Sequence, residues 1–423
     1  MTAALVDQEQ AALDVALGAG GIRAVYQPII DLGSSQVVAY EALARGPIGS
    51  ALERPDLLFA QARRQGRLDD LDARCRDAAV DGALGVLDDR LALFVNVEPE
   101  SLLGETPLFE RFAAAMGPKP RLVVEVTERA ITARPAELIA MADGARRLGF
   151  AIALDDLGAD PASLALLPLL APDVIKLDLS LIQGRPSVEA ARIHAAVSAE
   201  NERSGAIVLA EGIETAAHLR SARALGATLG QGYLFGRPGK LGTRSAARPL
   251  ELPAGSRAAV TPGATPFDVV ASQRPSLVAT KDTLIAMSKL LEEQAAHLES
   301  PGVCLSAFQV ARNLTPATVD RYQGLAVTSS LVAVFAADLA PGAVAGVRTG
   351  TLGPADRLRG EWSVVVLGSH HAAALVAKDL GDGGRDDHRR YEYALTHDRA
   401  LTVQAALTLM ARIDPDARPT PNS

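Results

Sequence analysis

The sequence has little of what disulfide-bonded and zinc-binding proteins are built from. Only two of its 423 residues are cysteines, Cys75 and Cys304, and they lie far apart with no second cysteine nearby. We expect both thiols to be small buried side chains in a reducing compartment. The sequence therefore predicts neither a disulfide framework nor a zinc site.

The chain also has no excess of positive charge and no long apolar run. It carries 42 basic and 50 acidic side chains, a formal net charge of −8. Proteins that track a nucleic-acid backbone need a basic face, so we expect no DNA or RNA partner. A small anionic nucleotide stays compatible with this charge, because metals or a few arginines could neutralise it locally. An uncharged stretch over residues 322–336 is too short to span a bilayer, and residues 1–20 lack the pattern of a signal peptide. We therefore expect a cytoplasmic protein with no membrane partner.

The composition is that of a folded protein with more than one domain. Apolar residues make up 48% and charged residues 22% of the chain, and its length predicts two to three domains. A stretch over residues 239–266 is rich in Gly, Pro, Ala and Ser, which is typical of a linker. We predict five segments: a helical N-terminal extension over 1–20, a barrel over 21–240, a linker over 241–266, a smaller domain over 267–413 and a disordered tail over 414–423.

Short apolar runs alternate with helical stretches before the linker. Residues 24–31 and 36–41 flank Gly33-Ser34-Ser35, a pattern that predicts a hairpin. Further strands are predicted over residues 91–96, 122–125, 150–155, 173–176 and 206–211, and helices over 55–67, 107–116, 133–148 and 187–203. Strand and helix in repeated alternation predict a parallel sheet covered by helices, and the length fits a closed (β/α)₈ barrel.

The predicted strands share one feature, which is a polar residue where each run ends. The residues at these ends are Glu41, Asn96, Glu125, Asp155 with Asp156, Lys176, Glu211 and Gln231. Taken singly, each could cap a helix or face solvent. Taken together, they meet on one face of a barrel, where carboxylates repel each other unless cations compensate.

Carboxylate and amide oxygens without Cys or His form the ligand set of Mg²⁺ or Mn²⁺. Two such cations suit phosphoester hydrolysis, because they activate a water and stabilise the leaving oxygen. A lysine among the carboxylates could orient that water or neutralise developing charge. The sequence thus predicts a site for hard divalent cations at the mouth of the barrel.

Arg45 follows Glu41 by four residues and has two interpretations of equal weight. Its guanidinium could form a forked contact with a phosphate at the rim. It could equally be a surface side chain that pairs with Glu53 or Asp56.

An ordered series of motifs over residues 20–240 resembles the EAL domains, bacterial phosphodiesterases for cyclic di-GMP. The motifs are Tyr26-Gln27-Pro28-Ile29, Glu41-Ala42-Leu43-Ala44-Arg45, Phe94-Val95-Asn96-Val97, Glu125-Val126-Thr127-Glu128, Asp155-Asp156, Lys176-Leu177-Asp178, Glu211-Gly212-Ile213-Glu214-Thr215 and Gln231-Gly232-Tyr233 to Pro238. The resemblance implies a modified (β/α)₈ TIM-like barrel with one antiparallel strand. It also implies hydrolysis of cyclic di-GMP to linear pGpG, and work as a homodimer.

The resemblance implies a role for each matching residue. Glu41, Asn96, Glu125 and Asp155 would ligate a first cation, and Asp155, Asp156 and Glu211 a second. Lys176 would hold the nucleophilic water, and Gln231 and Glu214 would support the site. The dinucleotide would contact Gln27, Leu43, Arg45, Asp178 and Pro238. Glu128 would anchor the loop that follows Asp156.

The sequence departs from the family pattern in that loop, which here reads Leu157-Gly158-Ala159-Asp160-Pro161-Ala162-Ser163. Asp160 stands where the family has its second glycine, so easy access to positive φ is lost. Pro161 fixes its own φ and restricts Asp160 to extended conformations. The departure favours weak or conditional turnover, although the ligand set is complete.

The region after the linker resembles the DICT domain, a sensory module found beside cyclic di-GMP enzymes. The resemblance rests on residues 361–367, 370–379 and 391–399. We expect a smaller mixed α/β domain with strands over 331–336 and 362–367 and helices over 281–297 and 401–413. Trp362 is expected in the core. The histidines at 370, 371 and 397 are expected to be packed or solvated, with metal binding and pH sensing the less favoured alternatives.

Two other functions compete with regulated hydrolysis. A non-catalytic receptor would bind cyclic di-GMP and pass its occupancy to a protein partner, as the altered loop favours. An interaction scaffold would bind neither nucleotide nor metal, which the complete ligand series makes the weakest alternative.

Overall fold

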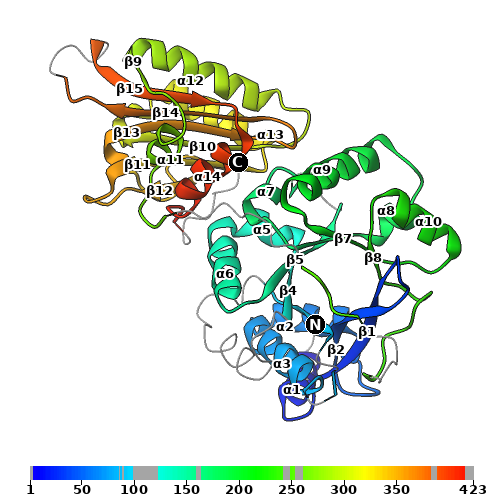
Figure 1. Ribbon diagram of the computed structural model, residues 1–423. Helices are drawn as coiled ribbons and strands as arrows, with labels where there is room; N and C mark the ends of the chain where they lie inside the picture. The colour runs from blue at the N-terminus through cyan, green and yellow to red at the C-terminus, as the bar shows by residue number, and fades with distance from the viewer. Residues whose placement is uncertain are drawn as a thin grey trace. The chain divides into compact units, whose positions relative to one another are not determined.

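The computed structural model describes residues 3–84, 86–87, 90–98, 122–158, 163–241, 248–252, 261–382 and 388–414. It contains two units, and each has its own β-sheet (Figure 1). The predicted helix over 107–116, the loop residues Asp160 and Pro161, and residues 415–423 of the predicted tail lie outside the described residues. Among the described helices, none combines the length and the apolar character that a membrane crossing requires.

Eight strands of the first unit close into a barrel in sequence order (Figure 1). They are β1 (Arg23–Asp31), β2 (Val37–Arg45), β3 (Ala92–Asn96), β4 (Leu122–Thr127), β5 (Ala151–Leu157), β6 (Val174–Leu177), β7 (Ile207–Ala210) and β8 (Leu229–Gly230). Strand β1 is antiparallel to both of its neighbours, β2 and β8, whereas the pairs from β2 to β8 are parallel. The predicted modified barrel with one antiparallel strand is confirmed.

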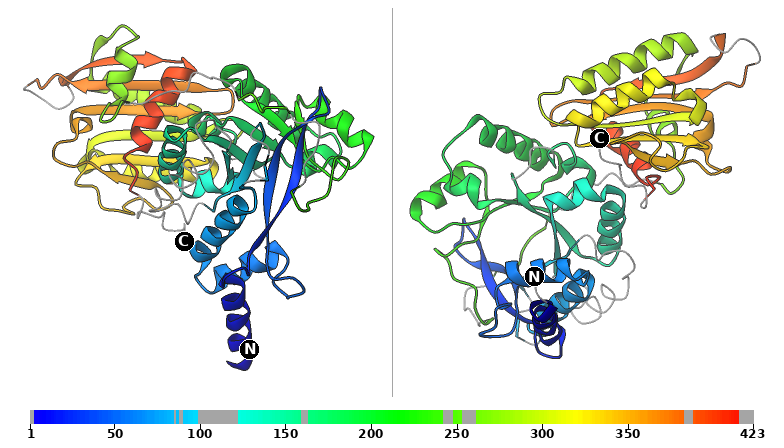
Figure 2. Two further views of the ribbon diagram at one scale, coloured as in Figure 1. Left: turned by 60° about the horizontal axis from the view of Figure 1, so that its bottom comes forward. Right: turned by 180° about the vertical axis from the view of Figure 1, so that it is seen from behind.

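Helices connect the parallel strands, as the alternation in the sequence predicts (Figure 2). They are α2 (Pro55–Arg64), α3 (Leu68–Asp81), α5 (Glu128–Ala133), α6 (Pro135–Arg147), α7 (Leu167–Leu170), α8 (Leu179–Gln183), α9 (Val188–Ser204) and α10 (Ala216–Ala224). Helix α9 shows how local sequence sets such bounds: the Ser187 side chain accepts a hydrogen bond from the Ala190 N–H, and Gly205 ends the helix at a φ of 75°. The helices predicted over 55–67, 133–148 and 187–203 are confirmed with small shifts at their ends.

The N-terminal helix α1 (Ala3–Leu17) packs on α2 and α3 through a small apolar cluster. Leu13 and Ala16 are fully buried there against Leu58 and Leu71. Cys75 packs against this cluster and is half-buried, so it is less buried than predicted. Cys304 in the second unit is buried as expected.

The second unit is a mixed seven-stranded sheet in the order β12-β11-β10-β13-β14-β15-β9. Its strands are β9 (Leu277–Thr280), β10 (Val303–Val310), β11 (Leu331–Ala337), β12 (Arg348–Thr351), β13 (Glu361–Leu367), β14 (Ala372–Asp379) and β15 (Arg390–Thr396). Its helices are α11 (Pro266–Ala271), α12 (Lys281–Ala296), α13 (Pro316–Thr328) and α14 (Arg399–Met410), with short 3₁₀ turns η3 (Ala311–Asn313) and η4 (Arg357–Gly360). The mixed α/β prediction and both predicted strands are confirmed, and α14 begins two residues earlier and ends three residues earlier than the predicted 401–413.

Helices α12 and α13 cover one face of this second sheet (Figure 2). Alternate residues of the central strands meet them, among them Cys304 and Phe308 on β10 and Val364 and Val366 on β13. This is the period of two that places every second side chain of a strand on the same face. Trp362 continues that face at the edge of the core, where it is half-buried and packs edge-on against Tyr391, with ring centroids 6.1 Å apart.

The histidines of the second unit behave as packed or solvated side chains. His370 is exposed and His371 is half-buried. Burial, helped by the nearby charges of His397 and Arg399, lowers the pKa of His371 and favours its neutral form. Within the described residues, the side-chain groups placed to hold a metal ion contain no histidine.

Candidate functional site

The site is a polar layer on top of an apolar layer inside the barrel. The apolar layer includes Ala39, Phe94, Val123, Ala153, Val174, Leu209 and Leu229. Two residues further along each of these strands, on the same face because side chains alternate, stand Glu41, Asn96, Glu125, Asp155, Lys176, Glu211 and Gln231. On the antiparallel β1 the order is reversed, so Gln27 precedes the buried Ile29. The predicted convergence of the strand-end residues is therefore confirmed.

Glu41 differs from the prediction in its position on the strand. The sequence predicts a strand that ends at Glu41, but β2 continues to Arg45. The extension exists because β1 pairs with β2 along its whole length, with Gln27 opposite Glu41 and Arg23 opposite Arg45. Glu41 is thus a mid-strand residue that faces the interior.

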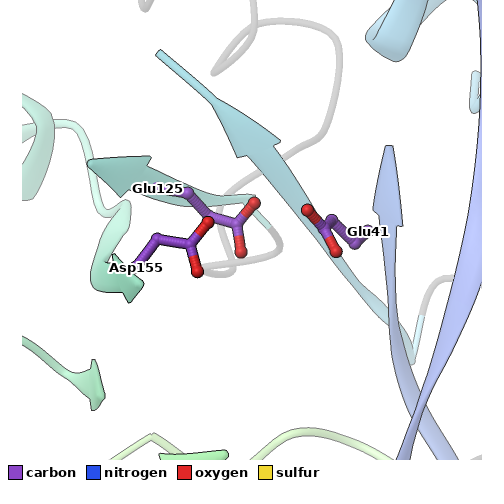
Figure 3. Close-up of side chains that lie close together, drawn as sticks. All are labelled: Glu41, Glu125 and Asp155. Atoms are coloured by element: carbon purple, nitrogen blue, oxygen red, sulfur yellow. The ribbon is translucent and has the colours of Figure 1, made fainter. Parts of the chain in front are cut away.

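Two groups of carboxylates converge in the polar layer (Figure 3). Glu41, Glu125 and Asp155 each have an oxygen within 4.8 Å of the others, and the same holds for Asp155, Asp156 and Glu211. Asp155 belongs to both groups. Figure 3 shows the carboxylates of Glu125 and Asp155 side by side, with Glu41 directed toward them from β2.

A backbone irregularity allows two consecutive aspartates to serve one site. In a regular strand, Asp155 and Asp156 would point to opposite faces. The pairing of β5 with β6 shifts register between Leu154 and Leu157, and Asp156 has a φ of 57°. Bulges of this kind re-aim side chains, and aspartate tolerates the left-handed region better than most residues. The strained residue lies at the site itself, as is common where function fixes the backbone.

Lys176 is the cation within this cluster of carboxylates. It is completely buried, and its Nζ lies 2.7 Å from Glu125, 2.8 Å from Glu211, 2.9 Å from Asp155 and 3.6 Å from Glu41. Five carboxylates, with Asp156 included, against one ammonium leave a formal charge of −5 + 1 = −4. The cluster fits divalent cations by this charge and by its oxygen-only donors.

The pKa values of the cluster reflect this excess of negative charge. Burial raises the pKa of Glu125 well above its usual range, and Glu41 and Asp155 add to the effect. Burial likewise raises the pKa of Glu211 to about 8, against the opposing charge of Lys176. For Lys176, burial lowers the pKa, but the surrounding carboxylates outweigh it and hold the pKa well above its usual value. The lysine therefore stays charged, and the carboxylates repel each other.

Two amide side chains fix the carboxylates in place. The Asn96 amide donates to Glu41 at 3.1 Å and to Glu125 at 2.9 Å. The Gln231 amide donates to Glu41 at 2.6 Å and to Gln27 at 3.1 Å. The Gln231 Oε1 atom is buried and has no hydrogen-bond partner among the described residues. This oxygen can therefore accept a hydrogen bond from a group bound at the site.

A cavity of about 360 Å³ opens over the polar layer. Seven predicted site residues line it: Gln27, Glu41, Leu43, Asp155, Glu211, Glu214 and Gln231. Leu179, Gln183, Gly212, Gly232 and Tyr233 also line it, and sequence reasoning did not single them out as site residues. Glu125 and Lys176 are buried side chains of the polar layer and do not belong to the lining.

Four further predicted residues lie outside the lining: Asp178, Glu128, Pro238 and Arg45. Asp178 caps α8 by accepting a hydrogen bond from the Ser180 N–H at 2.8 Å. Glu128 is buried at the start of α5, and Pro238 is half-buried after the last barrel strand. Arg45 ends β2 and donates to the carbonyl of Ala44 at 2.7 Å.

The two surface partners considered for Arg45 are paired with other arginines. Arg23 binds Glu53 at 2.5 Å, and Arg54 binds Asp56 at 2.7 Å. The guanidinium of Arg45 is half-buried at the end of its strand. The charges of both Glu41 and Glu53 act on Arg45, so the rim contact and the surface pair both stay predictions.

The loop after β8 brings Tyr233 to the cavity. Gly232 makes this turn, since a Cβ atom there would lie 2.2 Å from the Ile213 carbonyl oxygen. Tyr233 is half exposed, and the guanidinium carbon of Arg237 lies 4.1 Å from the centre of its ring. Its place directly after Gln231-Gly232 was the signal in the sequence that could have identified it.

Comparison with known proteins agrees with this geometry. The EAL domain model matches residues 10–238, and the model of the sensory domain in diguanylate cyclases and two-component systems (DICT) matches residues 267–380. The cyclic di-GMP phosphodiesterase NbdA of Pseudomonas aeruginosa is 33% identical over 224 residues, 50% of this chain and 28% of NbdA. The cyclic di-GMP phosphodiesterase RocR of the same organism is 28% identical over 238 residues, 52% of this chain and 58% of RocR.

Among solved structures, the EAL enzyme Bd1971 in its form bound to cAMP and cyclic di-GMP shares the fold. It has a TM-score of 0.50 and 22% identity, and the match covers 57% of this chain and 68% of that chain. The chain spans less than two thirds of the length of NbdA and RocR. The matched family model covers more than half of the 423 residues. This protein therefore belongs to the EAL domain family and carries a DICT domain after its barrel.

Proposed function

We infer that the barrel hydrolyses cyclic di-GMP to linear pGpG with two bound Mg²⁺ or Mn²⁺ ions. The observation that carries this inference is the pair of carboxylate groups that share Asp155, with Lys176 between them. Membership of the EAL family supports the choice of substrate, since NbdA and RocR are named cyclic di-GMP phosphodiesterases.

The residues present suit two divalent cations. Glu41, Asn96, Glu125 and Asp155 would hold the first, and Asp155, Asp156 and Glu211 the second. Two divalent ions carry a charge of +4, which would balance the formal charge of −4 in the cluster. When bound, the ions would lower the pKa of a water molecule and stabilise the oxygens of the phosphodiester.

Lys176 would orient the attacking water and balance charge during the reaction. In the net step, the water oxygen would form a bond to one phosphorus, and one ring P–O ester bond would break. One proton of the water would go to the departing sugar oxygen, and the other would stay on the new phosphate monoester or pass to solvent. The ammonium stays charged because four carboxylates lie within 3.6 Å of it. It is therefore a hydrogen-bond donor and a fixed positive charge, and it is not a base.

The remaining residues would bind and position the dinucleotide. Gln27, Leu43 and Glu214 line the cavity, which supports direct contacts between them and the dinucleotide. Arg45 would reach a phosphate from the rim, and Asp178 and Pro238 would contact the outer parts of the ligand. The free carbonyl oxygen of Gln231 would support the site from inside.

Regulation forms a separate part of the proposal. Glu128 would anchor the loop after Asp156, the protein would act as a homodimer in the cytoplasm, and the DICT domain would adjust turnover in response to a signal. A second function is favoured by Asp160 and Pro161, which replace the glycine-rich pattern of the family loop. In that case the barrel is a receptor that binds cyclic di-GMP, turns it over weakly and passes its occupancy to a protein partner.

A product assay paired with calorimetry tests both functions. The full chain is incubated with cyclic di-GMP and Mn²⁺, and pGpG is separated and quantified. Glu41→Gln should lower turnover at least about a hundredfold, because loss of a partner that merely orients a ligand already costs up to that much. Glu189→Gln, an exposed carboxylate on α9, is the matched control and should leave turnover unchanged.

The receptor function predicts calorimetric binding of cyclic di-GMP with no pGpG, and Asp160→Gly should then raise turnover. Absence of both binding and product in the unaltered protein would contradict both functions.

A further inference from the structure

The DICT unit contains a cavity of about 430 Å³ between α12, α13 and the adjoining face of its sheet. Small-molecule sites occupy about 300–1,000 Å³ and combine apolar walls with a few converging polar groups. Ile285, Phe308 and Trp362 supply apolar and aromatic walls here. The cavity therefore has the size and the walls of a ligand site.

The charge around the cavity is strongly biased. Lys281, Lys289, Arg312 and Arg321 line it, and Glu292 is the carboxylate among the lining residues. Arg321 already binds Glu292 at 2.8 Å, so Lys289 and Arg312 have no carboxylate partner left among the lining residues. This excess of positive charge occurs in a chain whose net charge is −8, which makes it a local feature of the cavity.

Helix α13 adds to the same bias. Its N-terminal turn, with Thr315, Ala317 and Thr318, lines the cavity. The N-terminus of a helix carries partial positive charge that favours an anion, although Pro316 has no N–H and the Thr318 N–H is already bound by the Thr315 side chain. Both the side chains and the helix therefore favour a negatively charged occupant.

Two buried donors are unused in the described part of the chain. Ser288 on α12 is 3% exposed, and its hydroxyl has no hydrogen-bond partner. The indole N–H of Trp362 is also buried and without a partner. Both residues line the cavity. A buried polar group without a partner is costly, so such groups mark places where a ligand or water completes the hydrogen bonding.

We propose that this cavity binds a small anion with a flat apolar part. Its carboxylate or phosphate-like group would lie among Lys289, Arg312 and the start of α13. Its flat part would lie against Trp362 and Phe308, and a polar atom of the anion would accept hydrogen bonds from the Ser288 hydroxyl and the Trp362 indole. The bound anion would also contact Arg321 and so reach Glu292 and Tyr322, which form a buried chain with Ser306 through bonds of 2.9 and 2.6 Å. Occupancy would thus be linked to the core of the sensory unit.

The protein offers its own reporter, because Trp362 is the only tryptophan in the chain. The probe is 4-nitrobenzoate, a flat anion whose nitro group quenches indole fluorescence on contact. The neutral 4-nitrobenzamide is the matched control, and 4-nitrophenylphosphonate tells a phosphate-like anion from a carboxylate. We expect saturable quenching of the full chain by at least one anion, about tenfold tighter than by the amide, which is about 1.4 kcal/mol.

Variants locate the site. Lys289→Gln combined with Arg312→Gln removes two exposed charges and should weaken binding of the anion about tenfold without changing that of the amide, as expected for partly exposed contacts. Lys378→Gln, an exposed lysine of the same unit outside the cavity, should bind the anion as the unaltered protein does. Unfolding curves of each variant show that the fold is kept.

Two results would overturn the proposal. One is quenching by the anions that is not saturable or is no tighter than by the amide. The other is equal binding of the anion by the double variant and by Lys378→Gln. Neither result depends on whether the barrel hydrolyses cyclic di-GMP.

Discussion

Removal of the Lys176 ammonium is the most informative single change in the barrel. Lys176→Met keeps the length of the side chain and removes the charge that contacts four carboxylates at 2.7 to 3.6 Å. Loss of one partner of a buried ion pair costs about 3–5 kcal/mol of stability. We expect the lower end, about 3 kcal/mol, because Glu125 and Glu211, whose pKa values are raised, can take up protons.

Divalent cations should reverse much of this loss. An ion that binds only the folded state adds about 2.7 kcal/mol at a hundred times its dissociation constant. We therefore expect Mn²⁺ to stabilise Lys176→Met more than the unaltered protein, since the variant has more negative charge to neutralise. Turnover should stay low even in Mn²⁺, because the donor that orients the water is gone.

Urea unfolding in the presence of a chelator and then of Mn²⁺ measures both effects. Lys240→Met, which changes an exposed lysine of the barrel segment, controls for the loss of one positive charge. Equal stability of the two variants in chelator would refute the argument that the carboxylates rely on Lys176. Full turnover of Lys176→Met in Mn²⁺ would refute its proposed role toward the water.

Three further predictions concern other parts of the chain. Burial raises the pKa of Glu361 from 4.5 to about 7. Between these two pH values the folded protein holds a proton that the unfolded chain releases. The free energy of unfolding therefore falls by about 3 kcal/mol as the pH rises through that interval. Glu361→Gln should remove this fall, and parallel pH profiles of the variant and the unaltered protein would contradict it. Gly232→Ala places a Cβ atom 2.2 Å from the Ile213 carbonyl oxygen, so the loop that holds Gln231 should shift and turnover should drop; unchanged turnover would show that the loop adapts. Tyr322→Phe removes a buried hydroxyl that donates to Glu292 at 2.9 Å and should cost about 1–3 kcal/mol in urea unfolding, whereas a change within error would mean that the bond adds no stability.

The polar layer could be predicted from the sequence because it depends on the order of residues within each strand. Each parallel strand is a buried apolar run, and its last inward-facing position is polar, so the residues at Asn96, Glu125 and Lys176 follow from the pattern alone. The pattern within one strand cannot predict the direction of the Asp156 side chain, since that direction depends on a register shift between β5 and β6. That shift is a property of the paired strands and not of either strand.

Some features of the structure depend on local contacts or on packing and did not follow from the sequence pattern. The family resemblance implied only a ligand contact for Asp178, and the structure adds a cap on α8 formed by its carboxylate. Five strands of the second sheet were not predicted: β9, β10, β12, β14 and β15. Among them, β9 is a short edge strand with two exposed apolar residues, and five of the eight residues of β14 are alanine or leucine without polar alternation. Trp362 was predicted in the core, but it borders a cavity. The presence of this cavity depends on how α12 and α13 pack on the sheet, which the sequence pattern does not contain.

The number of Mn²⁺ ions bound by the purified protein tests the central claim most directly. Titration followed by calorimetry should give two ions for the unaltered chain. Asp155→Asn should lose at least one of them, since this residue belongs to both carboxylate groups. Failure of the unaltered chain to bind Mn²⁺, or full binding by Asp155→Asn, would contradict the assignment of these carboxylates to a divalent cation site.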